Sequence, residues 1–384
     1  MSNISVYTPL SINSRPGNPQ KRGLGFRRQL DRFVGVPLLW LLGKLRHPRA
    51  LPEEIRHIVI LQTAAIGDTL LMSQAIRRLR RALPDARIIL ALGRDNRAVA
   101  ELLPRTDEVV LIDPLAPIQA LRTLRALKPD LLIDYGTWPR VNALLTALAG
   151  ARFTAGFKTP NQDRHFAYDY FAEHSAKRHE VENQRALLGF LGSTNEWDLS
   201  LEIPDSADFK PPLSSQSFVV FHPWASGSGK RLKEWPVEYW KELGIYIAEK
   251  VSGIILTGGP RDASDTDGLA AFVRRHIPTI LVISVAGSYS LAQTACLLRA
   301  ARAVVSVNTG IMHLAALLGV PTIGLHGPTN PARWGPYGPR TVSLLPSQGA
   351  YAYLNLGFEF PPAAQPCLQY LSPAKVAAAL SRWL

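Results

Sequence analysis

Cysteine is scarce in this chain of 384 residues, and its scarcity excludes several kinds of site. The two cysteines, Cys296 and Cys367, cannot build a disulfide framework or a cysteine-based zinc site. Both have apolar neighbours, so we expect buried packing residues in a reducing compartment. The sequence also has no His-Glu-x-x-His motif. We therefore expect no resident metal and no requirement for a divalent cation.

No apolar run is long enough to cross a bilayer, which takes about 20 residues as a helix. A shorter run, from Phe33 to Gly43, contains Pro37 and lies in a basic leader, residues 1–56. Ten Lys and Arg against three Asp and Glu give this leader +7 of the formal net charge of +13. Its first part, residues 1–22, is rich in polar residues, Pro and Gly, and we expect it to be poorly ordered.

Two interpretations of the leader stay open at this point. The favoured one is an anchor on a membrane surface, with apolar side chains in the lipid boundary and basic ones at anionic headgroups. The other is a helix packed on the body of the protein. The apolar set is Phe33, Leu38, Leu39, Trp40 and Leu42, and the basic set is Arg27, Arg28, Arg32, Lys44 and Arg46.

From residue 57 onward, apolar stretches of strand length alternate with amphipathic stretches of helical length. The first half predicts strands at 57–63, 87–92, 108–112 and 130–134, helices at 69–83, 95–103, 117–127 and 139–149, and a further helix around 179–192. After the Pro211-Pro212 pair, strands are predicted at 218–222, 253–257, 280–285, 303–307 and 321–326. This alternation is typical of an α/β protein with doubly wound parallel sheets. We expect domains at 57–210 and 211–345 and a tail at 346–384, with a helix that Ser372 and Pro373 begin.

Two loops of the second half have the composition of an anion site. Thr309 and Gly310 stand between a strand and a helix, where unpaired N–H groups and the helix dipole favour a phosphate. The loop after the strand at 218–222 holds Ser226, Lys230 and Lys233. Because loops of one parallel sheet can converge, the sequence predicts a nucleotide-diphosphate ligand.

Three segments, in the same order, resemble motifs of glycosyltransferase family 9, the ADP-heptose:lipopolysaccharide heptosyltransferases. They are Ile58–Leu71 with Gly67-Asp68, the loop Lys233-Glu-Trp-Pro236, and Asn308–Ala316 with Gly327–Tyr337. The resemblance spans about residues 57 to 384 and implies a GT-B architecture, two Rossmann-like domains facing a central cleft. It implies an acceptor domain followed by a nucleotide-sugar domain, with the tail packing back on the first domain. It also implies transfer of heptose from ADP-heptose to a lipopolysaccharide core or related lipid-linked glycan.

The resemblance assigns roles to several of these residues. Asp68 matches the catalytic carboxylate, although position alone favours a helix N-cap or first-turn carboxylate. Lys233 is the best cationic partner for the departing ADP, with Lys230 and Ser226 beside it. Thr309, Gly310 and His313 complete the phosphate cradle, and Asp262, with Asp265 and Asp267 as rivals, matches a ribose-binding residue. We expect a metal-independent displacement with inversion at the anomeric carbon.

Asn308 departs from the pattern, because aspartate is more usual before Thr-Gly in this family. A changed donor sugar, or a nucleotide-sugar-binding protein without catalysis, is therefore the alternative function. A dinucleotide-dependent oxidoreductase fits less well, because the turn before Gly67 lacks Gly-x-Gly-x-x-Gly. Nucleic acid is not an expected partner, because more than half of the positive charge lies in the leader. The basic leader instead predicts an enzyme held on the cytoplasmic face of the inner membrane.

The acceptor is not identified by the sequence. One candidate surface for a phosphorylated acceptor is a set of basic residues in the first half, although a solvated surface accounts for it equally well. The set is Arg77, Arg78, Arg80, Arg81, Lys158, Arg164 and Lys177.

Overall fold

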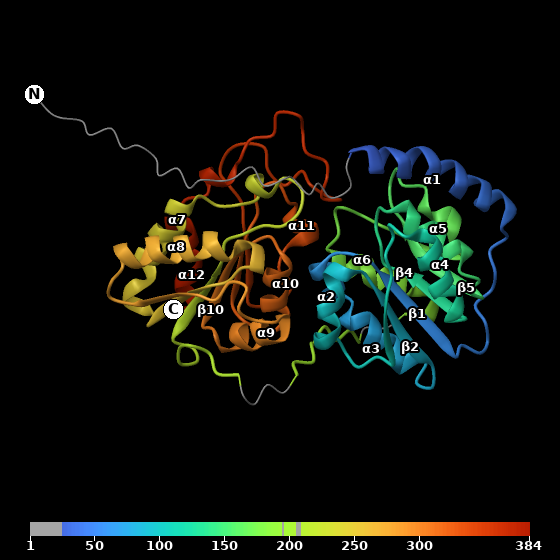
Figure 1. Cartoon of the computed structure of the whole chain (residues 1–384), viewed down its shortest axis with the longest axis horizontal. Helices are drawn as coiled ribbons and strands as arrows, with labels where there is room; N and C mark the ends of the chain where they lie inside the picture. The colour runs from blue at the N-terminus through green and yellow to red at the C-terminus, as the bar shows by residue number, and fades with distance from the viewer. Residues whose placement is uncertain (1–24, 194–195, 205–208) are drawn as a thin grey trace, which may run out of the picture.

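The computed structural model describes residues 25–193, 196–204 and 209–384, and the leader segment expected to be poorly ordered lies outside them. Two six-stranded parallel sheets form the frame of the described chain (Figure 1). The first has the order β3-β2-β1-β4-β5-β6 and the second β12-β11-β10-β7-β8-β9. The predicted α/β class with doubly wound parallel sheets is confirmed.

The inner strands of each sheet are short apolar runs that are covered on both faces. Ile58, Val59, Ile60 and Leu61 of β1 are all fully buried, which is why the strands read as continuous apolar runs instead of alternating ones. The strands of the first sheet are β1 His57–Gln62, β2 Arg87–Leu92, β3 Glu108–Leu111, β4 Leu131–Asp134, β5 Phe153–Lys158 and β6 Tyr170–Glu173. Those of the second are β7 Phe218–His222, β8 Gly253–Leu256, β9 Leu281–Ser284, β10 Ala303–Val307, β11 Thr322–Leu325 and β12 Thr341–Leu344.

The helices of the first sheet differ in places from the predicted ones. The helix predicted at 69–83 is two helices that meet at Met72, and the segment after β2 is the 3-10 helix η1, Arg94–Leu102. The α-helices between the strands of the first sheet are α2 Ile66–Leu71, α3 Ser73–Ala82, α4 Pro117–Ala126 and α5 Arg140–Leu148, and α6 Glu180–Leu187 follows β6. The second sheet carries α7 Val237–Ile247, α8 Ala263–His276, α9 Leu291–Ala300, α10 Gly310–Leu317 and α11 Pro331–Trp334, and α12 Pro373–Leu380 lies in the tail.

Three strands, β5, β6 and β12, were not predicted. In β5 the local pattern is broken by Gly156, and the structure gives the reason for a glycine there. A Cβ at this position would lie 2.2 Å from Cζ of Tyr168, so the ring occupies the space of a side chain. β6 and β12 are four-residue strands at the edges of their sheets, with partly exposed residues and a weak apolar signal.

The tail does not pack as expected. The expectation that its helix lies on the first domain is wrong, because α12 contacts α7 and β11 of the second half. Val376 and Leu380 of α12 belong to the same buried apolar cluster as Trp240. One tail residue does reach the first half, since the rings of Phe358 and Trp138 lie 5.3 Å apart.

The leader forms a helix, α1 Gly25–Leu45, that continues through Pro37. It packs on α5 and on the 3-10 helix η2, Arg164–Ala167, along the top of the first half in Figure 1. Among the described residues, no helix combines the length and the apolar character that crossing a bilayer requires.

Both sheets reverse their strand order at one point, between β1 and β4 in the first and between β7 and β10 in the second. In open parallel sheets, ligands bind outside the carboxyl ends of the strands at this point. The segments after β1 and β10 begin α2 and α10, which lie between the two sheets in Figure 1. The two reversal points therefore face a shared region.

Candidate active site

The first turns of α2 and α10 touch each other, and two glycines make this contact possible. A Cβ at Gly67 would lie 2.8 Å from Cδ2 of His313, and one at Gly310 would lie 2.6 Å from Cγ2 of Ile66. Real Cβ atoms do not approach so closely, so the helices could not meet here with larger residues. The contact joins segments that are more than 240 residues apart in the sequence.

Asp68 follows Gly67 and is carried to this junction. The N-cap of α2 is Ala65, so Asp68 is the third residue of the helix and not its cap. Its backbone carbonyl accepts a hydrogen bond from Nε2 of Gln184 at 3.0 Å, which ties α2 to α6. Asp68 thus lies in the first turn of α2, beside the first turn of α10.

The Thr309-Gly310 turn begins α10 without a side-chain cap. Thr309 is the N-cap of α10, in an extended conformation, and its side chain does not cap the helix. The first N–H groups of α10 are left for another acceptor, at the positive end of the helix dipole.

Asn308 has a structural role that an aspartate would lack. Its Nδ2 donates to the backbone carbonyl of Trp334 at 2.8 Å, which fixes the end of α11 against the start of α10. A carboxylate has no hydrogen to donate to a carbonyl. Asn308, which stands where the family more often has aspartate, therefore makes a hydrogen bond to Trp334 that an aspartate could not make.

The lysine-rich loop after β7 meets the start of α8. Nζ of Lys230 lies 3.0 Å from Oδ1 of Asp262 and 3.6 Å from Glu234, so these residues from the ends of β7 and β8 come together. Nζ of Lys233 donates to the carbonyl of Ser226 at 2.5 Å, within the same loop. Asp265 and Asp267, the alternatives to Asp262 as the ribose-binding residue, are exposed on α8.

Glu234, in the same loop, has a pKa far from its ordinary value. Burial raises the pKa of Glu234 to about 7, against the opposing effect of Lys230. Its carboxyl also accepts from the N–H of Ala225 at 3.1 Å. Burial alone would lower the pKa of Lys230, but Glu234 and Asp262 outweigh it and the net shift is upward. Lys230 thus stays cationic.

His313 is neutral in the folded protein. Burial lowers its pKa to about 3, and burial likewise lowers the pKa of His326 to about 3 and that of His222 to about 4. A neutral imidazole donates one N–H and carries no charge. His313 can therefore contribute a hydrogen bond to a ligand but not a cation.

A buried ion pair that the sequence did not reveal also joins the two halves. Nε of Arg333, in α11, lies 2.8 Å from Oε2 of Glu180, in α6, and both side chains are almost fully buried. His174 lies 3.0 Å from the same oxygen. Arg333 falls inside the family-like segment 327–337, whereas nothing in the sequence around Glu180 marks it as a partner.

The basic set proposed as an acceptor surface is largely engaged within the protein. Arg164 is completely buried and forms an ion pair with Asp134 at 2.5 Å, so its expected place on the surface is wrong. The arginines of α3 lie against acidic groups and carbonyls, with Arg80 2.7 Å from Asp107. Lys158 likewise lies 2.6 Å from Glu173.

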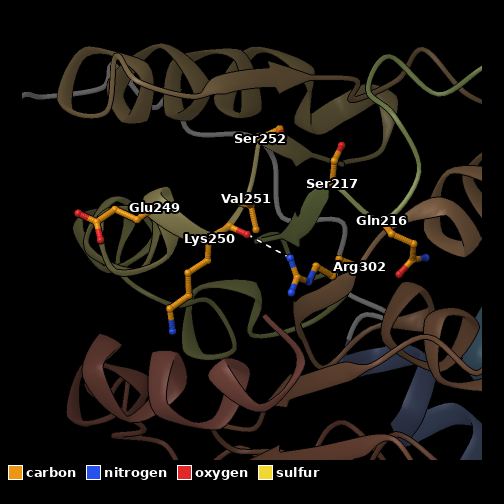
Figure 2. A pocket seen from close by; sticks show the side chains of 7 residues that line it. All are labelled: Gln216, Ser217, Glu249, Lys250, Val251, Ser252 and Arg302. Atoms are coloured by element: carbon orange, nitrogen blue, oxygen red, sulfur yellow. Dashed lines mark hydrogen bonds between the residues drawn. The ribbon is translucent and has the colours of Figure 1, made fainter.

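Two hollows on the surface lie away from this region. One, shown in Figure 2, is at the amino end of β7, where Gln216 and Ser217 precede the strand. There Arg302 donates to the carbonyls of Lys250 and Trp383. The other lies beside the arginines of α3. Neither contains a residue of the proposed site.

Comparison with known proteins identifies the family. The model of glycosyltransferase family 9 (heptosyltransferase) matches residues 118–355. Lipopolysaccharide heptosyltransferase 1 of Pseudomonas aeruginosa is 27% identical over 334 residues, covering 81% of this chain and 86% of that protein. The protein of the same name from Escherichia coli K12 is 26% identical over 301 residues, 73% of this chain and 91% of that one.

Solved structures show the same fold. ADP-heptose lps heptosyltransferase II of Escherichia coli superposes with a TM-score of 0.67 at 19% identity, covering 86% of this chain and 98% of that one. Escherichia coli heptosyltransferase WaaC with ADP gives 0.66 at 22% identity, covering 85% and 100%. The predicted GT-B architecture and the family resemblance are both confirmed. This chain belongs to glycosyltransferase family 9 and is a glycosyltransferase.

Proposed function

We propose that this protein transfers heptose from ADP-heptose to a hydroxyl group of a lipopolysaccharide core, with inversion and without a metal ion. Family membership supports the class of reaction, and the relatives named as lipopolysaccharide heptosyltransferases support donor and acceptor. The observation that carries the proposal is the contact between α2 and α10. It brings the helical turn that carries Asp68 next to the start of α10, which is suited to a diphosphate.

In the proposed reaction, the carboxylate of Asp68 takes the proton of the acceptor hydroxyl. The acceptor oxygen then forms a bond to the anomeric carbon of heptose, while the bond from that carbon to the β-phosphate oxygen breaks. The electron pair of the broken bond leaves with ADP. Attack opposite the leaving group inverts the anomeric centre.

The leaving group gains negative charge, which the second half of the protein would stabilise. The N–H groups at Thr309 and Gly310 and the dipole of α10 provide fixed positive ends. Lys233 and Lys230 supply the cations, and Asp262 would accept from a ribose hydroxyl beside Lys230. With these groups in place, a divalent cation has no separate task, and activity should survive a chelator.

Asn308 is part of this proposal and the basis of its main alternative. We assign it to the support of α11 through the carbonyl of Trp334, which leaves the donor unchanged. The alternative is a protein that binds a nucleotide sugar without turning it over, or one that uses a different sugar.

The proposal also includes a place of action. A lipopolysaccharide core under construction is attached to lipid, so the enzyme has to work where the lipid is. We propose the cytoplasmic face of the inner membrane.

The test is a panel of ADP-heptose and UDP-, GDP- and dTDP-hexoses, assayed with a chelator for donor binding and for release of nucleotide in the presence of core acceptor. Asp68→Asn should lower kcat by about 10²- to 10⁴-fold, the usual contribution of a general base, with donor affinity retained. Asp95→Asn is the matched control, because Asp95 is an acidic residue in the first turn of η1, after the neighbouring strand β2. Turnover that survives Asp68→Asn contradicts the assigned base, and binding without turnover in the wild type favours the alternative.

A further inference from the structure

The helix α1 has two opposite faces of different kinds. One face is fixed to the body of the enzyme at Gly35, Leu39 and Gly43, which recur every fourth residue and so share one side. Leu39 is completely buried in a cluster with Ala143 and Tyr168. The glycines allow close approach, since a Cβ at Gly35 would lie 2.9 Å from Cβ of Arg140, and one at Gly43 would lie 2.8 Å from Phe166.

Ion pairs hold both ends of α1 on this side. Near its start, Asp31 lies 3.1 Å from the guanidinium of Arg140 and accepts from the first two N–H groups of α5. Just after its end, Arg46 and Arg49 both contact the buried carboxylate of Asp169, at 3.1 and 2.7 Å. The helix is therefore part of the folded body, and the interpretation as a packed leader is correct for this face.

The opposite face is apolar and uncovered. Its large side chains are 44 to 73% exposed and recur at helical spacing over three turns. They are Phe33, Val34, Leu38, Trp40, Leu41 and Leu45. We call these six residues the outer face of α1. A contiguous apolar surface of this kind on a folded protein marks a site of association.

The surroundings of the outer face favour a lipid surface over a protein partner. Nζ of Lys44 lies 3.8 Å from the ring centre of Trp40, so a cation and an indole stand together at one border of the outer face. This pairing is typical of the interface between headgroups and acyl chains. Arg32 is exposed close by, and the leader as a whole carries an excess of seven positive charges. Anionic headgroups complement that charge.

We propose that the outer face of α1 enters the headgroup boundary of an anionic bilayer and lies in its plane. Crossing is excluded for this helix because its other face is committed to α5. Two residues first assigned to the lipid contact are reassigned, since Leu39 is buried against the protein and Arg46 pairs with Asp169. Leu42 is only half-exposed, next to them.

This docking also sets how the enzyme meets its acceptor. Asp31, in the second turn of α1, contacts Arg140, the first residue of α5, and Trp138 just before Arg140 contacts Phe358 of the second half. The amino-terminal part of α1 therefore lies close to the place where the two halves meet, and Figure 1 shows this end of the helix at the top of the molecule. A lipid-linked acceptor would reach the rim between the halves without leaving the bilayer. The identity of that acceptor rests on the proposed function, whereas the lipid contact does not.

The experiment compares binding of the full chain to vesicles of phosphatidylethanolamine and phosphatidylglycerol with binding to vesicles of phosphatidylcholine alone. Leu38→Asp/Leu41→Asp should weaken binding to the anionic vesicles at least tenfold. The matched control is Leu115→Asp/Ile118→Asp, which changes two equally apolar side chains that are 68 and 70% exposed beyond β3, and it should bind as the wild type does. Circular dichroism and turnover of a deacylated core acceptor should be unchanged in both variants.

A second readout locates the contact. Cys296 and Cys367 are buried, so a cysteine placed at Leu41 can be labelled with an environment-sensitive dye, with Leu115→Cys as its counterpart. The emission of the dye at position 41 should shift to the blue on adding anionic vesicles, and that at 115 should not. Unchanged vesicle binding of the α1 variant overturns the proposal. So does a dimer of the wild type that the same variant converts to a monomer, because the outer face would then bind a second copy. Vesicle binding through α1 in an enzyme that rejects ADP-heptose would leave this inference standing and remove only the proposed donor.

Discussion

Replacing Gly67 by alanine tests whether the contact between α2 and α10 sets the position of Asp68. The new Cβ would lie 2.8 Å from Cδ2 of His313, where ordinary contacts begin at 3.4 Å. The two helices therefore have to separate by about 0.6 Å, or the buried imidazole has to move. His313 is 4% exposed and has little space to turn.

The expected cost follows from two opposing effects. Overpacking a well-packed interior costs about 1 to 3 kcal/mol of folding free energy. Alanine regains roughly 0.5 to 1 kcal/mol, because glycine is unfavourable within a helix. The net loss of stability should be about 0 to 2.5 kcal/mol. The effect on kcat should be larger, on the order of 10- to 100-fold, since displacements approaching 1 Å cost about that much in a positioned reaction.

The assay measures kcat and KM for ADP-heptose together with the free energy of unfolding in urea. Gly268→Ala is the matched control, because Gly268 lies within α8 and a Cβ there would meet no atom within 4 Å. That variant should be slightly more stable than the wild type and fully active. A Gly67→Ala enzyme with wild-type kcat would refute the claim that this contact positions the base.

Three further predictions concern stability. Arg333→Met should lower the free energy of unfolding by about 3 to 5 kcal/mol in a urea titration, because it leaves the carboxylate of Glu180 buried without its cation. The double variant Glu180→Gln/Arg333→Met should lose less stability. An equal or greater loss in the double variant would count against an ion-pair origin. Glu234→Gln tests a pH dependence of stability. Folding raises the pKa of the Glu234 carboxyl from 4.5 to about 7. The stabilising contribution of this carboxyl is therefore complete below about pH 4.5 and is lost as the pH rises through about 7, by roughly 3 kcal/mol. The variant should lose less stability than the wild type between about pH 5 and pH 8, and parallel curves would disprove the shift. Asp31→Ala should weaken the attachment of α1 by about 1 to 2 kcal/mol, seen as faster amide exchange in α1 and at the start of α5 but not in α12; unchanged exchange would show that Asp31 does not hold the helix.

The fold could be predicted where the local pattern is strong. The runs that became β1, β2 and β10 are continuous and apolar, and the Thr309-Gly310 turn after β10 marks the start of α10. β5 could not be predicted in this way, because Gly156 is explained only by Tyr168, a residue that comes later in the chain and lies beside it in space. No bounds were predicted for α1, because Pro37 interrupts the apolar run from Phe33 to Gly43, although the helix continues through it.

The candidate site shows the same limit. Asp68, Lys233 and Gly310 were assigned through motifs, and those roles remain predictions. The partners of Lys230 and Asn308 could not be read from the sequence, because they are tertiary contacts with Asp262 and Trp334. The pair of Glu180 and Arg333 spans 153 residues, and neither residue type is expected in a core unless it is paired.

The contact of Gly67 with His313 has a consequence for unwanted hydrolysis. The proposed base belongs to one half of the protein and the proposed diphosphate cradle to the other, so a movement of the two halves away from each other would separate them. A sugar nucleotide bound to the open protein would face water without an aligned carboxylate to activate it. Only closure, which narrows the space for solvent, would complete the reactive arrangement. A site divided between the two halves would thus protect the sugar nucleotide from hydrolysis until an acceptor is bound.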